Sequence, residues 1–178
     1  MKFSTIVVYS LALTLFVSGC FQGNGKHEYI TIGALLPLTG TDSDEGVRAL
    51  NGIQIAKQEI NEKGGIFGKR LDIIVLNYKS DEIYALHQYN ILKEKGVAAI
   101  IGSGNPNVTE VLVKSSETDG IPIFLPSIIN SLSEDQNGKL TDFEKSYFSN
   151  FSQIPLSNSA SAYNCVFTLL EAISILEK

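Results

Sequence analysis

The chain has little of the side-chain chemistry that builds most catalytic and metal sites. Its 178 residues include two cysteines and two histidines. His27 lies in a short polar stretch before the first apolar run, and His87 stands alone within a helical pattern. A metal site or a nucleophile–base pair needs several such side chains close together. We therefore expect solvated histidines, no metal ion, no cofactor and no catalytic residue.

Known enzyme loops are missing as well. The segment Gly64–Arg70 superficially suggests a phosphate-binding loop, but it has three rather than four residues between its glycines and no Ser or Thr after Lys69. It also follows a helical pattern instead of a strand. Gly102-Ser103-Gly104 lacks the spacing of the nucleophile elbow of hydrolases. These absences argue against a nucleotide-dependent enzyme and against a hydrolase.

Charge of one sign is not concentrated anywhere. The chain has 14 Lys and Arg against 19 Asp and Glu, a formal net charge of −5, and no basic stripe. A nucleic-acid partner is therefore not expected. Hydrophobic residues make up 44% of the chain, which is enough for the core of one ordinary domain.

The first twenty residues form a tripartite export signal. Lys2 provides the positive start, residues 6–17 are apolar, and Val17-Ser18-Gly19 place small residues before Cys20. The apolar run is short for a membrane span. Its last four residues resemble the bacterial lipobox, in which the cysteine becomes the lipidated N-terminus. We predict a signal peptide over 1–20, lipidation of Cys20 and a tether over 21–28, with an uncleaved anchor or a plain signal peptide as alternatives.

Processing at Cys20 would leave Cys165 as the only side-chain thiol. An exported protein with one such cysteine has no intrachain disulfide framework. Cys165 stands beside Val166 and Phe167 in a helical pattern. Since a free cysteine behaves mostly as a small hydrophobic residue, we expect it to pack in the core.

After residue 28 the pattern alternates between strands and helices. Apolar runs predict strands at 29–36, 71–76, 97–101 and 121–125. Helical spacing between them is marked first by Ala49, Ile53, Ala56 and Ile60, then by Ala85, Tyr89 and Leu92, and then by Val108, Val111 and Leu112. Strands separated by crossover helices lie parallel, so the order predicts an α/β fold: a doubly wound, Rossmann-like parallel sheet of about four strands with helices on both faces.

The alternation stops after residue 125. Residues 134–141 read as a polar linker, followed by helices at 142–151 and from 157 onward, with no fifth strand. We treat 29–178 as one α/β lobe, with 142–178 as its C-terminal helices.

Several stretches together resemble one family of solute receptors. They are Ile32–Gly40, Asn51–Ala56, Glu59–Leu71 with its Ile-Asn-x-x-Gly-Gly-Ile-x-Gly run, Gly120–Ile123 and Ala160–Val166. The sequence resembles the periplasmic binding proteins of the branched-chain amino-acid (Leu/Ile/Val) type, which have the type 1 fold and serve ABC importers. The resemblance implies a substrate-binding protein outside the cytoplasm, anchored to the membrane through lipid on Cys20, with an ABC permease as partner.

The resemblance covers only one of the family's two lobes. Residues 29–133 correspond to the first pass through the N-terminal lobe and 142–178 to the return into it. The second lobe is missing, and the polar linker at 134–141 stands in its place. The implied protein is therefore a truncated or degenerate receptor. A surface lipoprotein whose single lobe binds another protein, without binding a solute, is the alternative.

Ligands of open parallel sheets lie beyond the carboxyl ends of the strands. In the family this edge receives the carboxylate of an amino acid, so the ligand would be an amino acid or related carboxylate. The candidate ligand-binding residues are Glu45, Ser103, Gly104, Asn105, Asn107, Ser127 and Asn130. The sequence departs from the family at three positions: Pro106 replaces a frequent Ser, Ile129 a usual Thr, and Glu45 a frequent aromatic residue.

Overall fold

The computed structural model describes residues 28–102, 105–126 and 141–176. The expected signal peptide, the lipidation site Cys20 and most of the expected linker lie outside these ranges. Within them, no helix is both long enough and apolar enough to cross a membrane.

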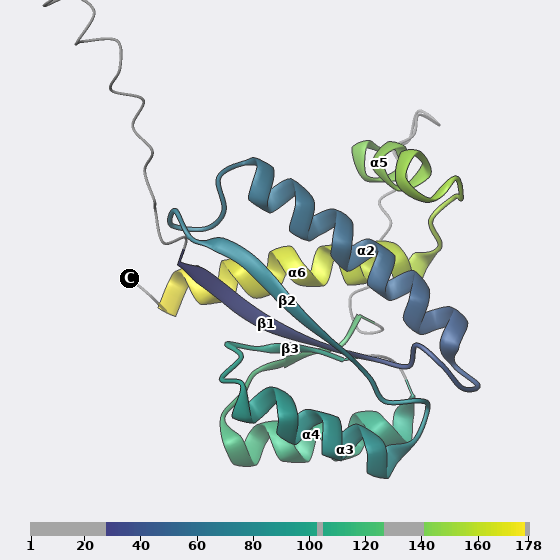
Figure 1. The fold of residues 1–178 in the computed structure, drawn as a ribbon, viewed down its shortest axis with the longest axis vertical. Helices are drawn as coiled ribbons and strands as arrows, with labels where there is room; N and C mark the ends of the chain where they lie inside the picture. The colour runs from purple at the N-terminus through teal and green to yellow at the C-terminus, as the bar shows by residue number, and fades with distance from the viewer. Residues whose placement is uncertain (1–27, 103–104, 127–140, 177–178) are drawn as a thin grey trace, which may run out of the picture.

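Four parallel strands form a single sheet at the centre of the molecule (Figure 1). They are β1 (Tyr29–Leu36), β2 (Arg70–Asn77), β3 (Ile100–Ile101) and β4 (Ile123–Phe124). The order across the sheet is β2-β1-β3-β4, and β1 pairs with β2 along its whole length. The chain passes from β1 to β2 on one side of it and then to β3 on the other side, so the strand order reverses at β1. The predicted doubly wound α/β fold is confirmed.

Helices cover both faces of this sheet in two layers. They are α2 (Ser43–Glu62), α3 (Glu82–Glu94), α4 (Pro106–Asp119), α5 (Asp142–Phe151) and α6 (Ser157–Leu176). In Figure 1, α2 and α6 lie on one side of the strands and α3 and α4 on the other, while α5 lies beyond α2. The amphipathic spacing of α2 places Ala49, Ile53, Ala56 and Ile60 in the core, as predicted.

The core has one part on each side of β1, which is buried almost throughout. Ile32 and Ala34 face the layer of α2 and α6, where Val166 and Leu169 meet them. Leu35 faces the layer of α3 and α4, with Tyr89 and Leu112. Because both faces of the central strands are covered, these strands are continuous apolar runs without alternation.

Two strands are shorter than predicted. In the predicted strand at 97–101, only Ile100–Ile101 forms a strand. The chain already runs beside β1 at Ala98, because the N–H of Ala98 donates to the Thr31 carbonyl oxygen (2.8 Å). The run at 121–125 yields only Ile123–Phe124, because Pro122 has no N–H for a strand ladder. The carbonyl oxygen of Pro122 still accepts the N–H of Ile100 (2.8 Å).

The packing of α6 against α2 depends on a glycine. A Cβ atom at Gly52 would overlap the carbonyl oxygen of Ser159, so only glycine permits this close approach of the two backbones.

Cys165 is buried in the same layer, where desolvation raises the pKa of its thiol to about 12. The prediction of a packing cysteine is confirmed.

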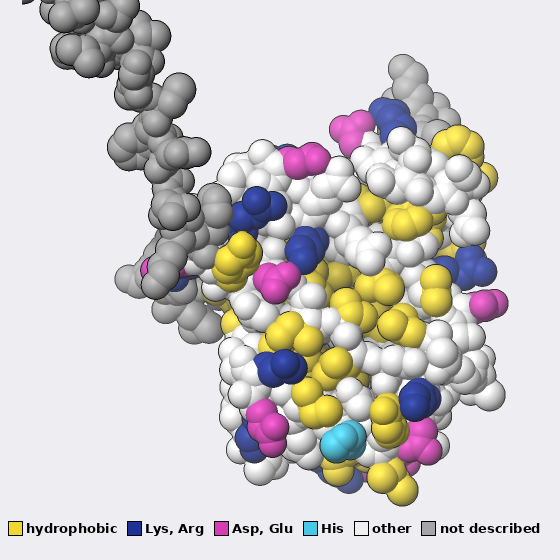
Figure 2. Space-filling view, in the orientation of Figure 1, with side chains coloured by type: hydrophobic (Ala, Val, Ile, Leu, Met, Phe, Trp, Pro, Cys, Tyr) yellow, Lys and Arg dark blue, Asp and Glu magenta, His cyan; other side chains and the backbone are white. Residues whose placement is uncertain are grey.

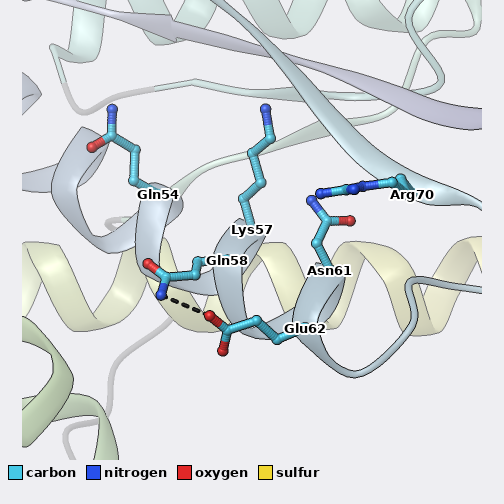
Figure 3. Close-up of a pocket in the computed structure, with 6 residues that line it drawn as sticks. All are labelled: Gln54, Lys57, Gln58, Asn61, Glu62 and Arg70. Atoms are coloured by element: carbon cyan, nitrogen blue, oxygen red, sulfur yellow. Dashed lines mark hydrogen bonds between the residues drawn. The ribbon is translucent and has the colours of Figure 1, made fainter.

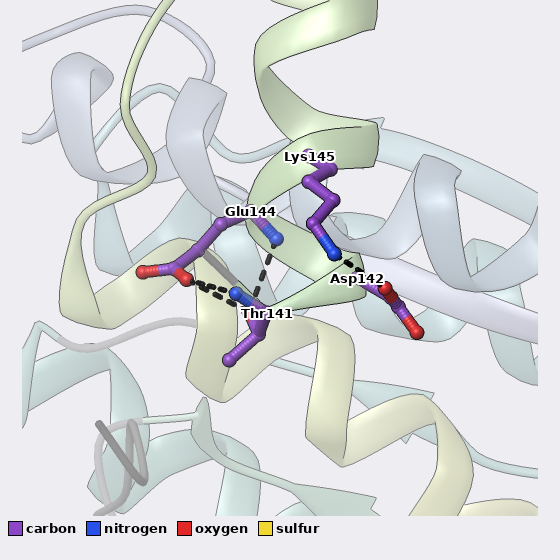
Figure 4. A network of polar contacts seen from close by, with 4 residues as sticks. All are labelled: Thr141, Asp142, Glu144 and Lys145. Carbon is purple, nitrogen blue, oxygen red and sulfur yellow. Dashed lines mark hydrogen bonds and ion pairs between the residues drawn. The ribbon is translucent and has the colours of Figure 1, made fainter. Parts of the chain in front are cut away.

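The short helix α5 begins with a complete capping box (Figure 4). The Thr141 hydroxyl accepts the N–H of Glu144 (3.2 Å), and the Glu144 carboxylate accepts the N–H of Thr141 (2.6 Å). Its apolar face meets the outside of α2 and α6 through Phe143 and Tyr147, and the Phe143 ring lies 4.5 Å from that of Tyr163. The predicted helix at 142–151 is confirmed.

Candidate functional site

All four strands end at the same edge of the sheet, because they are parallel. Three chain segments leave this edge: residues 37–42 after β1, residues 78–81 after β2, and the chain that enters α4 after β3. The crevice at the reversal of strand order is the usual ligand site of such sheets. In this chain the strand order reverses between β1 and β3, and we call the edge between the ends of these two strands the crevice.

The first two segments are joined by Asn77, the last residue of β2. Its Oδ1 atom accepts the N–H groups of Leu38 (2.9 Å) and Lys79 (2.9 Å), and its Nδ2 atom donates to the Thr39 hydroxyl (2.9 Å). Ser80 adds a third link between the two loops, since its Oγ atom accepts the N–H of Asp42 (3.0 Å). These bonds fix the loop after β1 against the loop after β2.

Asp42 connects this pair of loops to the start of α4. It stands at the N-cap of α2 without capping it, and its carboxylate instead accepts Nδ2 of Asn105 (3.2 Å) and the Thr41 hydroxyl (3.3 Å). The bond between Asp42 and Asn105 crosses the crevice between β1 and β3. The sequence analysis predicted Asn105 at this site and did not include Asp42, Asn77 or Ser80. Their position directly after buried strands is the signal that could have identified them.

The N-terminus of α4 is capped by its own chain. Oδ1 of Asn105 accepts the N–H groups of Asn107 (3.1 Å) and Val108 (3.5 Å), and Pro106 has no N–H to offer. A free helix N-terminus would suit a carboxylate. Here an incoming carboxylate must displace the side-chain oxygen of Asn105 before it can use these donors.

Glu45 lies on the other side of the crevice, in the first turn of α2. It is partly buried, and its carbonyl oxygen accepts Nδ2 of Asn158 near the start of α6 (3.3 Å). The same turn carries Asp44, so the α2 side of the crevice is acidic. Of the seven predicted ligand-binding residues, the structure therefore brings Glu45, Asn105 and Asn107 to one edge. Ser103, Gly104, Ser127 and Asn130 lie outside the described residues.

A second hollow lies at the opposite end of the sheet (Figure 3). It has a volume of about 430 Å³ and is lined by Gln54, Lys57, Gln58, Asn61, Glu62 and Arg70. Lys57 pairs with Asp72 (2.8 Å), which lowers the pKa of that carboxyl, and Gln58 donates to Glu62 (2.8 Å). Four of the six lining side chains therefore bond within the chain, those of Lys57, Gln58, Asn61 and Glu62.

The described residues contain no arrangement suited to catalysis or metal binding. Within them, no three side chains of His, Cys, Asp or Glu lie close enough together to hold a metal ion. The large pKa shifts belong to packed groups: burial and Asp119 raise the pKa of Tyr89 to about 12, and burial and Glu59 raise that of Tyr163.

Many α/β domains of this architecture bind a small molecule at the carboxyl edge of the sheet. Comparison with known proteins gives the family: the sequence model of the periplasmic binding protein family matches residues 29–153. The chain belongs to this family. Its members are extracytoplasmic solute-binding proteins and not enzymes, in agreement with the sequence analysis.

Related proteins carry the names of branched-chain amino-acid receptors. The chain is 33% identical over 118 residues to the Leu/Ile/Val-binding protein BraC3 of Rhizobium johnstonii, which covers 66% of this chain and 32% of that protein. It is 30% identical over 96 residues to the Leu/Ile/Val-binding protein homolog 7 of Brucella abortus, which covers 53% of this chain and 24% of that protein. The chain therefore spans about a third or less of the length of these relatives.

Solved structures similar to this chain also include branched-chain amino-acid binding proteins. This chain is similar to the branched-chain amino acid transporter substrate binding protein LivJ from Streptococcus pneumoniae, solved in complex with isoleucine. The TM-score is 0.52 and the identity 27%, and the match covers 61% of this chain and 30% of that one. The leucine binding protein LivK from Thermotoga maritima is similar with a TM-score of 0.50 and 26% identity, over 55% of this chain and 27% of that one. The partial coverage fits a single lobe.

Proposed function

We propose that this protein is the solute-binding lobe of an ABC importer for branched-chain amino acids or similar small solutes, a truncated or degenerate receptor anchored outside the cytoplasm through Cys20. The proposal is supported above all by the match of the family model to residues 29–153, together with relatives named for Leu, Ile and Val. We propose the ABC permease as its partner.

We further propose that the solute lies in the crevice between β1 and β3, with its polar end toward Asn105 and Asn107. Asn105 is already bonded on both sides, to Asp42 and to the start of α4. Binding of a carboxylate therefore costs the loss of the cap, and the nearby carboxylates of Asp42, Asp44 and Glu45 oppose it. We expect weak binding, with a dissociation constant on the order of millimolar.

A thermal-shift screen of the full chain in detergent micelles tests this proposal. The panel holds the twenty amino acids, small amides and short carboxylates, each at a concentration well above millimolar. A ligand at about 100 times its Kd stabilises the folded state by about 2.7 kcal/mol, which raises Tm by several degrees. A selective rise with Leu, Ile or Val supports the proposal, and a sharp melting transition that no compound shifts contradicts it.

Asp42→Asn sharpens the test because it removes one opposing charge. The amide keeps an acceptor oxygen for Asn105, so the local fold is retained. We expect tighter binding of a carboxylate ligand, by up to about tenfold for one nearby charge partly exposed to water. The matched control is Asp119→Asn, at the far end of α4, which should leave the affinity unchanged. Weaker binding in Asp42→Asn would contradict the proposed location.

One observation favours the alternative of a protein-binding lobe. Phe148 on α5 and the connector residues Ile154 and Leu156 are 56%, 70% and 49% exposed. Large apolar side chains this exposed often mark an interface. A melting transition without any ligand shift, together with loss of a partner in the triple variant that places Ser at these positions, would favour this role over solute binding.

A further inference from the structure

The turn between α2 and β2 carries a large apolar side chain at a strained backbone position. Ile66 and Lys69 exchange both of their backbone hydrogen bonds, each 2.8 Å long. Phe67 and Gly68 therefore form the two-residue tip of a hairpin turn, and both have positive φ angles, 51° and 77°. Tips of this kind favour Asn or Asp followed by Gly, and a bulky aromatic residue there costs conformational energy. The turn itself gives no reason for an aromatic residue at Phe67.

Packing within the fold does not explain Phe67 either. Its side chain is 56% exposed, whereas the neighbouring Ile66 packs against the core beneath α2 and α6. A Cβ atom at Gly68 would meet no described atom within 4 Å beyond its chain neighbours, so the tip stands clear of the rest of the lobe. Strained residues of this kind cluster at sites where a protein contacts a partner.

Two further exposed apolar side chains lie at the same edge of the sheet. Tyr29 is 58% exposed; it begins β1 and pairs with Arg70, directly after the turn. Ile175 is 67% exposed in the last turn of α6. Figure 1 shows the end of α6, the start of β1 and the turn before β2 at one end of the molecule, opposite the carboxyl edge. We call Tyr29, Phe67 and Ile175 the amino-edge group.

The lobe is connected to the predicted lipid anchor at this same edge. Glu28 precedes β1, and its carboxylate lies 3.7 Å from Nζ of Lys69 in the turn. From Cys20 to Glu28 the chain advances eight residues, which span at most about 30 Å when fully extended. An anchor at Cys20 therefore keeps the amino-edge group close to the surface of the bilayer.

The charges at this edge do not oppose such a contact. Lys63 lies 3.9 Å from the carboxylate of Glu59, and Lys69 is paired with Glu28. The opposite, carboxyl edge carries the acidic first turn of α2. Figure 2 shows charged side chains of both signs interspersed over the broad face, without a large area of one sign. Because bilayers that contain anionic lipid repel acidic surfaces, charge favours the amino edge over the carboxyl edge as the side turned to the membrane.

We propose that the amino-edge group rests on the lipid bilayer, with the Phe67 ring inserted at the level of the headgroups. This inference rests on the anchor of the proposed function and adds a second membrane contact to it. Aromatic rings are enriched at this level, where the Tyr29 hydroxyl would also remain in water. The tether holds the edge at a high local concentration, so a contact too weak to form in solution can form here. In this orientation the crevice at the carboxyl edge faces away from the bilayer.

A tryptophan reporter tests the contact directly. The chain has no tryptophan, so Phe67→Trp places a single reporter at the tip of the turn. The full chain with this substitution is reconstituted in vesicles of phosphatidylcholine with a minor fraction of phosphatidylglycerol, with or without bromine on the acyl chains. Brominated vesicles should lower the emission by at least about half, since interfacial apolar groups lie about 5–10 Å into the headgroup boundary. Phe148→Trp, also at a position 56% exposed but on α5, is the matched control and should lose far less.

Equal quenching of the two reporters, or of neither, would overturn the proposal. An emission shift that follows the ratio of protein to lipid and not the bromination would mean that a second copy covers the ring, and would overturn it as well. Flotation of the same vesicles separates this inference from the proposed anchor. A chain that does not float contradicts both, whereas a floating chain without quenching contradicts the bilayer contact alone. Solute binding plays no part in either measurement.

Phe67→Asn tests the same contact from the side of the fold. It places the preferred Asn-Gly pair at the tip, so Tm in detergent micelles should equal or exceed that of the wild type. In a chain with Tyr29→Trp as the reporter, adding Phe67→Asn should reduce the quenching by brominated lipid about twofold, because interfacial binding scales with the buried apolar area. A lower Tm would show that the ring packs within the fold, and unchanged quenching would show that it does not touch lipid. Either result would overturn the proposal.

Discussion

Asn105 uses both ends of its carboxamide to join two elements of the candidate site. Its oxygen caps α4, and its nitrogen donates to Asp42 at the start of α2. The residue therefore links the two sides of the crevice, and its side-chain oxygen occupies N–H donors that a bound carboxylate would need.

Asn105→Ala should lower the free energy of unfolding by about 1 kcal/mol, the usual loss for a helix N-cap. Urea denaturation followed by circular dichroism measures this loss. Asn107→Ala is the control, because Asn107 is exposed and its side chain makes no hydrogen bond within the described structure. Equal losses in the two variants would show that the cap carries no stability.

The ion pair between Lys57 and Asp72 makes part of the stability depend on pH. The bond to Lys57 lowers the pKa of Asp72 from its ordinary 3.8. A carboxyl whose pKa is lower in the folded state stabilises the protein above the unfolded pKa, and this contribution disappears as the pH falls through the folded pKa.

Asp72→Asn should therefore destabilise the protein at pH 7 by about 0.5 kcal/mol, a small value because the two side chains are 47% and 35% exposed. The difference from the wild type should shrink as the pH falls below the ordinary pKa of 3.8 toward the lowered pKa of the folded state. Urea denaturation at pH 7, 5 and 3 measures it. A difference that stays constant with pH would mean that the pair contributes only packing.

At the scale of elements, the packing of α2 on α6 is the most demanding contact in the lobe. Gly52→Ala places a methyl group against the Ser159 carbonyl oxygen, so the helices must move apart. We expect a loss of about 1–3 kcal/mol, the range for overpacking. Gln58→Ala, an exposed position on the same helix, is the control and should be nearly neutral. Thermal melts of both variants compare them, and a neutral Gly52→Ala would contradict the described packing.

The capping box of α5 has its own test. Thr141→Ala removes the acceptor for Glu144 and should cost about 1 kcal/mol. Hydrogen exchange should show faster exchange in residues 142–151 than in α2, because α5 lies at the periphery. Ser149→Ala, on an exposed face of α5, is the control. Unchanged exchange in Thr141→Ala would mean that packing of Phe143 and Tyr147 alone holds the helix.

Helices and buried strands were predictable because their signals are local. The spacing of Ala49, Ile53, Ala56 and Ile60 defines α2, and the apolar run at 29–36 defines β1. The strands at 97–101 and 121–125 came out shorter because strand length depends on a partner, and pairing between β3 and β4 involves two residues on each strand. Propensity alone does not contain that information.

For the candidate site, the position of three residues at the carboxyl edge was predictable, but the hydrogen bonds that join them to other residues were not. Strand order and the resemblance located Glu45, Asn105 and Asn107 at the carboxyl edge. The bond from Asn105 to Asp42 joins residues 63 positions apart, and that from Asn61 to Leu71 replaces a strand by a side chain. Such contacts depend on the three-dimensional arrangement, so the sequence pattern could not supply them.

At the scale of the whole molecule, the described lobe would form one wall of the proposed binding site. A good small-molecule pocket covers about 70–90% of its ligand, which normally requires a second wall. Among the described residues, Asp42 and the first turn of α2 face Asn105 and the first turn of α4 across the crevice, and all of them belong to this one lobe. The central claim is therefore that this one lobe folds independently and still recognises a branched-chain amino acid at its carboxyl edge, with low affinity.

A titration of the ¹⁵N-labelled full chain in detergent micelles with isoleucine, followed by two-dimensional NMR, tests this claim most directly. Our proposal predicts dispersed signals of a folded lobe and saturable shifts, with a Kd on the order of millimolar, for the amides of Asp42, Glu45, Asn105, Asn107 and Val108. Glycine serves as the control ligand and should cause smaller shifts because it lacks the apolar side chain. A well-dispersed spectrum that isoleucine leaves unchanged, or shifts confined to residues far from the carboxyl edge, would contradict the central claim.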